Sequence, residues 1–232
     1  MIKFENTEVM NFSGALRGMR NPLNSWDKSD SVICKGGSDF TDCKTIPANE
    51  CPRICDFDNT IFCIGRNDMD LARRLIKAGS DHRKFLRQIF VSVDITAPLY
   101  WWKEFDTYKI GTVADSCSTM HKIHSKRFEL NDFSIEHLLD EDCCWWRSGF
   151  SEVVNGLNVA RDNYLETKDK KYWWQMIQLL PASYNQKRTV TLNYETLRNI
   201  YGSRKDHKLD EWRVDFMEWI KSLPYSSDLI IN

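Results

Sequence analysis

A strictly alternating segment in the first half of the chain constrains the fold more than any other feature. Between residues 89 and 95, β-branched aliphatic side chains alternate with Phe, Ser and Asp, and a period of two predicts a β-strand with one buried face. A helix is expected before it, from an N-cap at Asp68 to a C-terminal Gly79. Another is expected after it, because Pro98 suits the first turn of a helix and an aromatic run follows. The residues on the buried face of the strand are Ile89, Val91, Val93 and Ile95.

The second half of the sequence contains more helix than strand. Apolar spacing predicts helices over residues 150 to 168 and 171 to 180. A short β-branched strand at 189 to 192 leads into a helix from Tyr194 to about Arg204. A last amphipathic helix carries Leu209, Trp212, Phe216 and Ile220 on one stripe. For 232 residues, this mixture predicts one α/β (α+β) domain that spans 1–232.

Residues 31–63 are the least orderly part of the chain. The first thirty residues show no clean periodicity beyond one short helix, and residues 31–63 combine Gly36-Gly37 and two prolines with five cysteines. We predict that 31–63 forms a long inserted loop. Thiolates at short spacing can bind zinc, but only Cys51 and Cys55 are close, so reduced thiols are favoured and no metal site is predicted. The cysteines are Cys34, Cys43, Cys51, Cys55 and Cys63.

Composition and charge exclude several classes of protein. Thirty-two basic and thirty-three acidic residues leave a net charge of -1, so there is no global cationic field and no non-specific nucleic-acid binding is expected. No apolar run approaches the length of a membrane span, and no secretory signal is visible, so a cytoplasmic location is expected. The Trp pairs are interpreted as core and interface anchors, with an aromatic plate for a flavin or base as the alternative: Trp101-Trp102, Trp145-Trp146 and Trp173-Trp174.

The densest group of chemically useful side chains lies at residues 101–121. Hydroxyls, carboxylates, a lysine, a thiol and an imidazole follow the aromatic helix within this segment, which could line a polar pocket. The alternative is a Ser/Thr-rich loop that satisfies its own backbone through local hydrogen bonds. A catalytic pair of Cys117 and His121 is a weaker alternative, because nearness in sequence does not establish the geometry of a nucleophile and its base.

A second candidate site lies on the helix that starts after residue 193. On a helix, Asn193 and Arg204 lie on nearly the same face, about 16 Å apart along the axis, and could contact two ends of one extended ligand. The alternative is that Asn193 caps the helix and Arg204 complements its C-terminal dipole. The sequence leaves both readings open.

This carboxyl-terminal part resembles the flavin-dependent thymidylate synthases (ThyX). In that family a Leu-Pro pair is followed at fixed distance by N-x-R-S-L-x-N-F-L-x-x-R, and here Leu180-Pro181 leads without a gap to residues 193–204, with both asparagines, the leucine and the final arginine in place. The resemblance implies a ThyX-like fold with a central, mostly antiparallel sheet and long flanking helices. It also implies that Asn193 and Asn199 face flavin and that Arg204 binds the nucleotide phosphate.

The family signature R-H-R-x-x-S-x-N-E-x-S-x-R falls on residues 107–119, where only softened matches remain. Its first Arg-His pair, which meets the flavin, is Thr107-Tyr108, its closing arginine is Thr119, and a further family arginine is Ile177. Each lost guanidinium removes charge-assisted hydrogen bonds worth roughly 1.5–3 kcal/mol. The resemblance places Tyr108 and Lys109 at the cofactor, and assigns the nucleotide to Lys109, Thr112, Asp115, Ser116, Cys117 and Ser118, together with Arg204.

The function that this resemblance implies is binding of a pyrimidine nucleotide such as dUMP, with FAD as cofactor and one-carbon transfer to uracil. NADPH and methylenetetrahydrofolate are implied only if the family reaction is retained. The family is a homotetramer with shared sites, so a homo-oligomer is expected. The alternative is a non-catalytic nucleotide-binding or sequestering protein that kept the fold and lost flavin chemistry. The replaced signature leaves open whether the protein is an enzyme.

Overall fold

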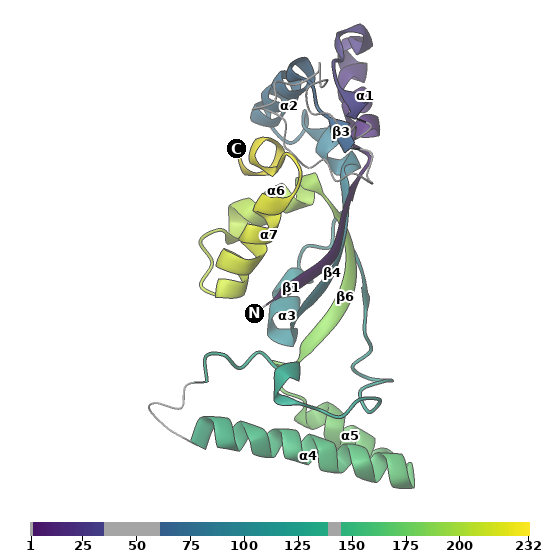
Figure 1. Cartoon of the computed structure of the whole chain (residues 1–232), viewed down its shortest axis with the longest axis vertical. Coiled ribbons are helices and arrows are strands. Elements are labelled where there is room, and N and C mark those ends of the chain that lie inside the picture. The colour runs from purple at the N-terminus through teal and green to yellow at the C-terminus, as the bar shows by residue number, and fades with distance from the viewer. Residues whose placement is uncertain (1, 35–60, 139–144) are drawn as a thin grey trace. The chain divides into compact units, whose positions relative to one another are not determined.

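The computed structural model describes residues 2–34, 61–138 and 145–232. Its central element is a four-stranded antiparallel sheet with the strand order β1-β4-β6-β5 (Figure 1). The strands are β1 (Lys3–Met10), β4 (Phe90–Pro98), β5 (Val113–Ser116) and β6 (Asn185–Asn193). Helices flank the sheet. The α/β fold with a mostly antiparallel sheet is therefore confirmed.

The alternating segment forms the buried strand that the sequence predicts. β4 buries every second side chain, and all four predicted face residues have 0% exposure. Pro98 ends this strand and is the N-cap of α3 (Leu99–Phe105), so it lies one position before the first helical turn. The aromatic residues of α3 are buried as predicted: Trp101, Trp102 and Phe105.

Chain contacts divide the molecule into two units, and the prediction of a single domain stays a prediction. Unit 1 comprises 1–6, 93–109 and 113–190, and unit 2 comprises 7–92, 110–112 and 191–232. Each is described by itself below.

Unit 1 contains a helical pair that carries its own core. The two helices are α4 (Trp145–Thr167) and α5 (Lys170–Leu179), close to the predicted ranges. Buried Asn158 of α4 holds the preceding segment, because its amide donates to Phe128 O at 2.9 Å and its Oδ1 accepts from Phe128 N at 2.9 Å. The core of this pair consists of Ile123, Phe128, Phe133, Val154, Leu157, Ala160 and Met176.

Unit 2 contains several helices and a short antiparallel pair of strands, β2 (Val32–Cys34) and β3 (Ile61–Cys63). Its helices are α1 (Phe12–Arg20), α2 (Arg66–Ala78), α6 (Tyr194–Arg204) and α7 (Met217–Ser222), the last continuing a π-helical turn at Glu211–Phe216. Phe12 of α1 connects distant parts of this unit, because its ring packs edge-on against Tyr194 of α6 and Tyr225 beyond α7, and parallel to Phe62. The final helical stripe is buried at Trp212, Phe216 and Ile220 as predicted.

Two expectations for the amino-terminal region are wrong. No strand is expected before Asp68, but β1 lies there, whereas α1 agrees with the short helix that the sequence indicates in the first thirty residues. Asp68 is also not an N-cap: α2 begins at Arg66 after Gly65, and the Asp68 side chain is fully buried inside the helix. The C-terminal role of Gly79 is confirmed by its φ of 110° and by its N–H, which donates to Ile76 O.

The predicted cysteine loop begins and ends in strands. β2 (Val32–Cys34) pairs antiparallel with β3 (Ile61–Cys63). Cys43, Cys51 and Cys55 lie outside the described residues, and Cys63 is buried. No helix in the parts of the chain that the structure describes combines the length and apolar composition that crossing a bilayer requires.

Candidate functional site

The amino-terminal end of α6 holds the loop at residues 110–112. The Asn193 Oδ1 accepts from the backbone N–H of Thr196 at 2.9 Å, which confirms that Asn193 caps this helix. Its Nδ2 donates to Gly111 O at 3.5 Å, and the Thr196 hydroxyl donates to Ile110 O at 3.2 Å. Two side chains of one helix end therefore fix the backbone of the loop. No sequence pattern indicated that the Thr196 hydroxyl binds this loop.

The close approach at this loop requires glycine. Gly111 has a φ of 76°, and a Cβ added there would lie 2.5 Å from the Asn193 Nδ2. Both observations disfavour any side chain at this position. The next residue, Thr112, has a buried hydroxyl with no hydrogen-bond partner among the described residues. A buried hydroxyl without a partner is unfavourable, so Thr112 is a candidate contact for a ligand.

Asn199 of α6 lies beside an ion pair that Glu195 of the same helix makes with Arg83. The Arg83 Nε lies 2.9 Å from the Glu195 Oε2, and both side chains are largely buried. The Arg83 Nη2 donates to the Asn199 Oδ1 over a long 3.5 Å. The Asn199 side chain is exposed. This residue therefore keeps an amide edge at the surface, one turn beyond Glu195.

Arg204 lies in the last turn of α6, where a cation complements the helix dipole. Its guanidinium carbon is 5.2 Å from the centre of the Trp212 ring, and the side chain is half-buried. Such stacking orients the planar guanidinium. The structural interpretation of these two residues is therefore present, since Asn193 caps α6 and Arg204 lies in its last turn. These roles do not prevent either residue from also binding a ligand, which is left to experiment.

The remaining candidate residues belong to unit 1. Tyr108 and Lys109 follow the end of α3, and the Tyr108 N–H donates to Phe105 O at 3.0 Å. Asp115 and Ser116 are exposed on β5. The exposed Cys117 is held through its backbone, whose N–H donates to Lys187 O at 2.9 Å.

Ser118 has a local structural role. Its hydroxyl oxygen accepts from the backbone N–H groups of Met120 and His121, the latter at 2.8 Å. At this one residue, the hydrogen bonds are of the local kind that the Ser/Thr-loop alternative assumes, and the choice between that alternative and a polar pocket stays open.

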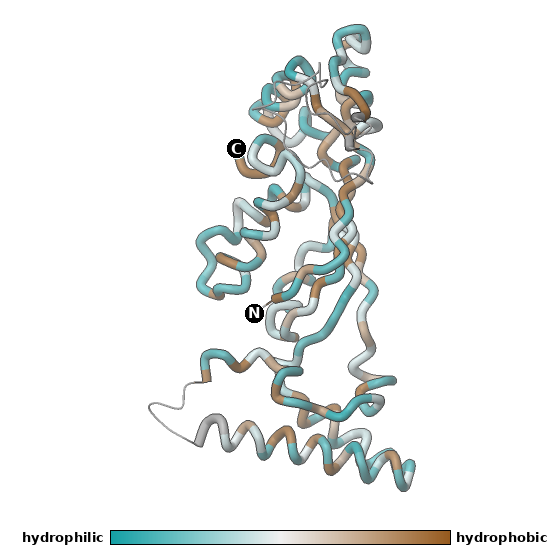
Figure 2. Tube along the Cα trace, viewed as in Figure 1, coloured by the Kyte–Doolittle hydropathy of each residue, from teal (hydrophilic) through white to brown (hydrophobic). Residues whose placement is uncertain are grey.

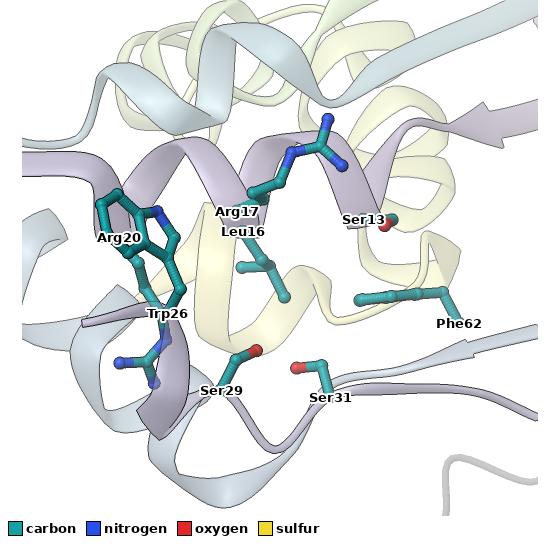
Figure 3. Close-up of a pocket in the computed structure, with 8 residues that line it drawn as sticks. All are labelled: Ser13, Leu16, Arg17, Arg20, Trp26, Ser29, Ser31 and Phe62. Atoms are coloured by element: carbon teal, nitrogen blue, oxygen red, sulfur yellow. The ribbon is translucent and has the colours of Figure 1, made fainter. Parts of the chain in front are cut away.

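A pocket that the sequence did not predict lies in unit 2. Its volume is about 330 Å³, within the range typical of small-molecule sites. Figure 3 shows one face of α1 on one side and the loop with Ser29 and Ser31 on the other. None of the sequence-predicted residues lines this pocket. Its lining residues are Ser13, Leu16, Arg17, Arg20, Trp26, Ser29, Ser31 and Phe62.

Arg20, one of the residues that line this pocket, belongs to a buried ion pair with Asp68. The Arg20 Nε lies 2.5 Å from the Asp68 Oδ1, and their side chains are 5% and 0% exposed. The hydroxyls of Ser29 and Ser31 donate to the Asp68 Oδ2. Burial raises the pKa of Asp68, but hydrogen bonds from Ser31, Ser29 and Arg20 outweigh it and hold the pKa below the ordinary value. Both oxygens of the Asp68 carboxylate are therefore bound by side chains of the fold itself.

No group of His, Cys, Asp and Glu side chains in the described ranges is arranged to hold a metal ion. The chemistry that these clusters offer is hydrogen bonding and charge recognition. The donors of interest are the Thr112 hydroxyl, the Asn199 amide and the Arg204 guanidinium, all in unit 2.

The architecture is that of the ThyX-like α/β fold. Two crystal structures of ThyX from Helicobacter pylori, each in complex with FAD and dUMP, match it with a TM-score of 0.62 and 15% sequence identity. The match covers 99% of this chain and 96% of the first structure, and 98% and 97% for the second. No family model matches the sequence, and no curated protein matches it either. At this identity the likeness establishes the fold alone.

Proposed function

We propose that this protein binds a pyrimidine nucleotide such as dUMP and that flavin assists transfer of a one-carbon unit to its base. The observation that carries the proposal is the match over nearly the whole length of ThyX structures that hold FAD and dUMP. The family pattern retained at residues 193–204 supports it. The alternative function differs in chemistry but not in the nucleotide.

Arg204 is the proposed phosphate ligand. A guanidinium offers several N–H donors in a plane that matches phosphate oxygens, and stacking on Trp212 at 5.2 Å orients that plane. The Thr112 hydroxyl, buried without a partner among the described side chains, is proposed to donate to the ligand. The roles of Lys109, Asp115, Ser116, Cys117 and Ser118 in unit 1 stay predictions.

The residues proposed to hold flavin in unit 2 are Asn193 and Asn199. The Asn193 Oδ1 is used by the helix cap, whereas its Nδ2 makes only a 3.5 Å hydrogen bond. The Asn199 amide is exposed. These donors fit the carbonyl and ring-nitrogen acceptors of a flavin. Bound flavin would supply the redox and one-carbon chemistry, and this chain would supply orientation and hydrogen bonds.

The alternative function is nucleotide binding without catalysis. It is favoured by the replacement of the family's flavin-contacting Arg-His pair by Thr107-Tyr108, and of two further arginines by Thr119 and Ile177. NADPH and methylenetetrahydrofolate belong only to the catalytic version. The homotetramer that the resemblance implies is proposed for both versions, and light scattering of the purified protein would measure it.

The absorbance spectrum of the purified full-length chain separates the two functions. Flavin bands at near-stoichiometric level, with FAD identified by mass spectrometry after release, support the enzyme. A colourless protein that does not take up added FAD but is stabilised by dUMP supports the binder. A protein that responds to neither ligand contradicts both.

The phosphate role of Arg204 is tested by thermal unfolding with dUMP. A ligand at 100 times its Kd stabilises a protein by about 2.7 kcal/mol. Arg204→Gln should weaken dUMP binding by about 10- to 150-fold, the equivalent of roughly 1.5–3 kcal/mol. Without ligand the loss of the Trp212 contact should lower the Tm by only about 1–4 °C. The matched control is Arg213→Gln, which removes an exposed guanidinium paired with Asp210. Equal dUMP responses in both variants would contradict the proposal.

A further inference from the structure

The turn between α4 and α5 gathers lysines and aromatic rings that the proposed function does not use. Figure 1 shows the two helices side by side, and Figure 2 shows the carboxyl-terminal end of α4 as hydrophilic. All of these residues belong to unit 1. We call this surface the turn patch and define it by Lys122, His124, Tyr164, Lys168, Lys170, Trp173 and Trp174.

The aromatic half of the turn patch lies at the start of α5. The Trp173 indole N–H donates to Met120 O at 2.8 Å, which fixes the ring against the neighbouring loop. Trp174 packs edge-on against it at 4.9 Å and is 45% exposed. The Lys170 Nζ lies 5.8 Å from the Trp174 ring centre. A large, oriented aromatic face is thus presented to solvent beside a cation.

The second half lies at the end of α4 and is continuous with the first through the loop at 120–124. The His124 ring packs edge-on against Tyr164 at 5.0 Å, and the Lys168 Nζ lies 5.9 Å from the centre of the Tyr164 ring. The Arg161 Nε donates to His124 O at 3.0 Å. The patch therefore has a fixed framework of rings with lysines at its margin.

The local charge of the turn patch is positive. Lys171 and Arg161 are paired with Asp169 and Asp162. In contrast, the patch lysines Lys122, Lys168 and Lys170 form no ion pair with a carboxylate of the described part of the chain. Burial, and then the charges of Lys122, Lys168 and Arg161, lower the pKa of His124.

We propose that the turn patch binds single-stranded nucleic acid, with backbone phosphates on Lys122, Lys168 and Lys170 and a base stacked on Trp174. Lysines that track a phosphate backbone, combined with an exposed ring on which bases stack, are the elements of sequence-tolerant single-strand binding. An acidic peptide would satisfy the lysines but has no planar face for Trp174. A lipid surface would need an apolar cluster to insert, whereas the rings here are flanked by lysines. The overall charge of -1 means that any such binding is local rather than driven by a global field.

The test is the anisotropy of a fluorescein-labelled oligothymidylate of about 16 nucleotides, titrated with the full-length protein over a series of KCl concentrations. Three phosphate contacts predict a slope of log K against log salt near -2, because each contact on a single strand contributes about -0.7. Changing Lys122, Lys168 and Lys170 together to Gln should abolish that slope and weaken low-salt binding at least tenfold. Trp174→Ala should weaken binding by about 5- to 150-fold and leave the salt slope unchanged.

Matched controls separate the patch from general charge. The triple variant Lys77→Gln, Lys103→Gln, Lys221→Gln makes the same change in net charge at exposed lysines elsewhere, and Trp26→Ala removes another half-exposed indole. Both should bind like the unaltered protein. Absence of binding at low salt, equal losses in the control variants, or anionic phospholipid vesicles bound in preference to the oligonucleotide would each overturn the proposal. Arg204→Gln should bind the oligonucleotide normally, so the outcome is independent of the dUMP experiment.

Discussion

The buried ion pair between Arg20 and Asp68 makes the sharpest stability prediction. Asp68 is on α2, has 0% side-chain exposure and lies 2.5 Å from the Arg20 guanidinium. Asp68→Asn keeps the size of the side chain and removes its charge. The Arg20 charge, only 5% exposed, then stays buried without an opposite charge, which is the costly way to break such a pair.

The expected cost follows from that burial. Removing one partner of a buried pair destabilises a protein by about 3–5 kcal/mol, which for a chain of this size is roughly 6–20 °C in Tm. The matched control is Asp70→Asn on the same helix, where the carboxylate is 59% exposed and lies 3.4 Å from Arg73. An exposed pair contributes about 0–1 kcal/mol, so the control should change the Tm by less than about 4 °C.

Urea unfolding and circular dichroism melts of both variants measure the difference. A double variant, Arg20→Met with Asp68→Leu, removes both charges and should recover much of the loss, since apolar replacement of a buried pair is often neutral. The reasoning from burial is refuted if Asp68→Asn lowers the free energy of unfolding no more than Asp70→Asn does. It is also refuted if the double variant is less stable than Asp68→Asn by the full cost of a second lost contact.

Two further predictions concern other parts of the fold. Asn193→Ala should destabilise the protein by about 0.5–2 kcal/mol in urea unfolding, because the α6 cap is lost. Asn193→Ser keeps a capping oxygen and should be nearly as stable as the unaltered protein. Equal losses of stability in the two variants would contradict a capping role. The Thr189 hydroxyl, then Asn6 and Lys187, lower the pKa of Asp94 from 3.8 to about 2. A lowered pKa in the folded state means that the Asp94 contribution is present above pH 3.8 and lost as the pH falls through about 2. A carboxyl titration by NMR should give a midpoint near 2, and a midpoint near 3.8 would show that these contacts do not form.

The sequence predicted best where one periodic signal decided the structure. The β4 alternation and the Asn193 cap are local patterns, and each is present as predicted. Asp68 was misassigned for the opposite reason. Its residue type favours a cap, but its actual partner is Arg20, forty-eight positions earlier, and sequence spacing carries no information about a contact of that range. The pocket beside α1 was not predictable for the same reason, because its lining residues come from separate segments of the sequence.

The strand β1 was missed because its pattern is weak. It is an edge strand of the sheet, and its side chains are almost all exposed. An edge strand without a buried face has no strict alternation for sequence reasoning to detect. The candidate site at residues 110–112 was only partly predictable for a related reason. Thr112 was identified, while the Thr196 tether and the need for Gly111 depend on a contact between distant segments.

The residues of the ThyX-like pattern at 193–204 differ in how far the fold itself requires them. Two of its positions have structural roles, because the Asn193 Oδ1 caps α6 and Leu197 has 0% exposure in the core. A chain that kept only the fold would need these residues, so they support the fold and say little about chemistry. Thr112 and Asn199 are different: the first has a buried hydroxyl without a partner among the described residues, and the second has an exposed amide. Neither position is explained by packing. Function is therefore tested at Thr112, Asn199 and Arg204, whereas substitution of Asn193 reports on stability first.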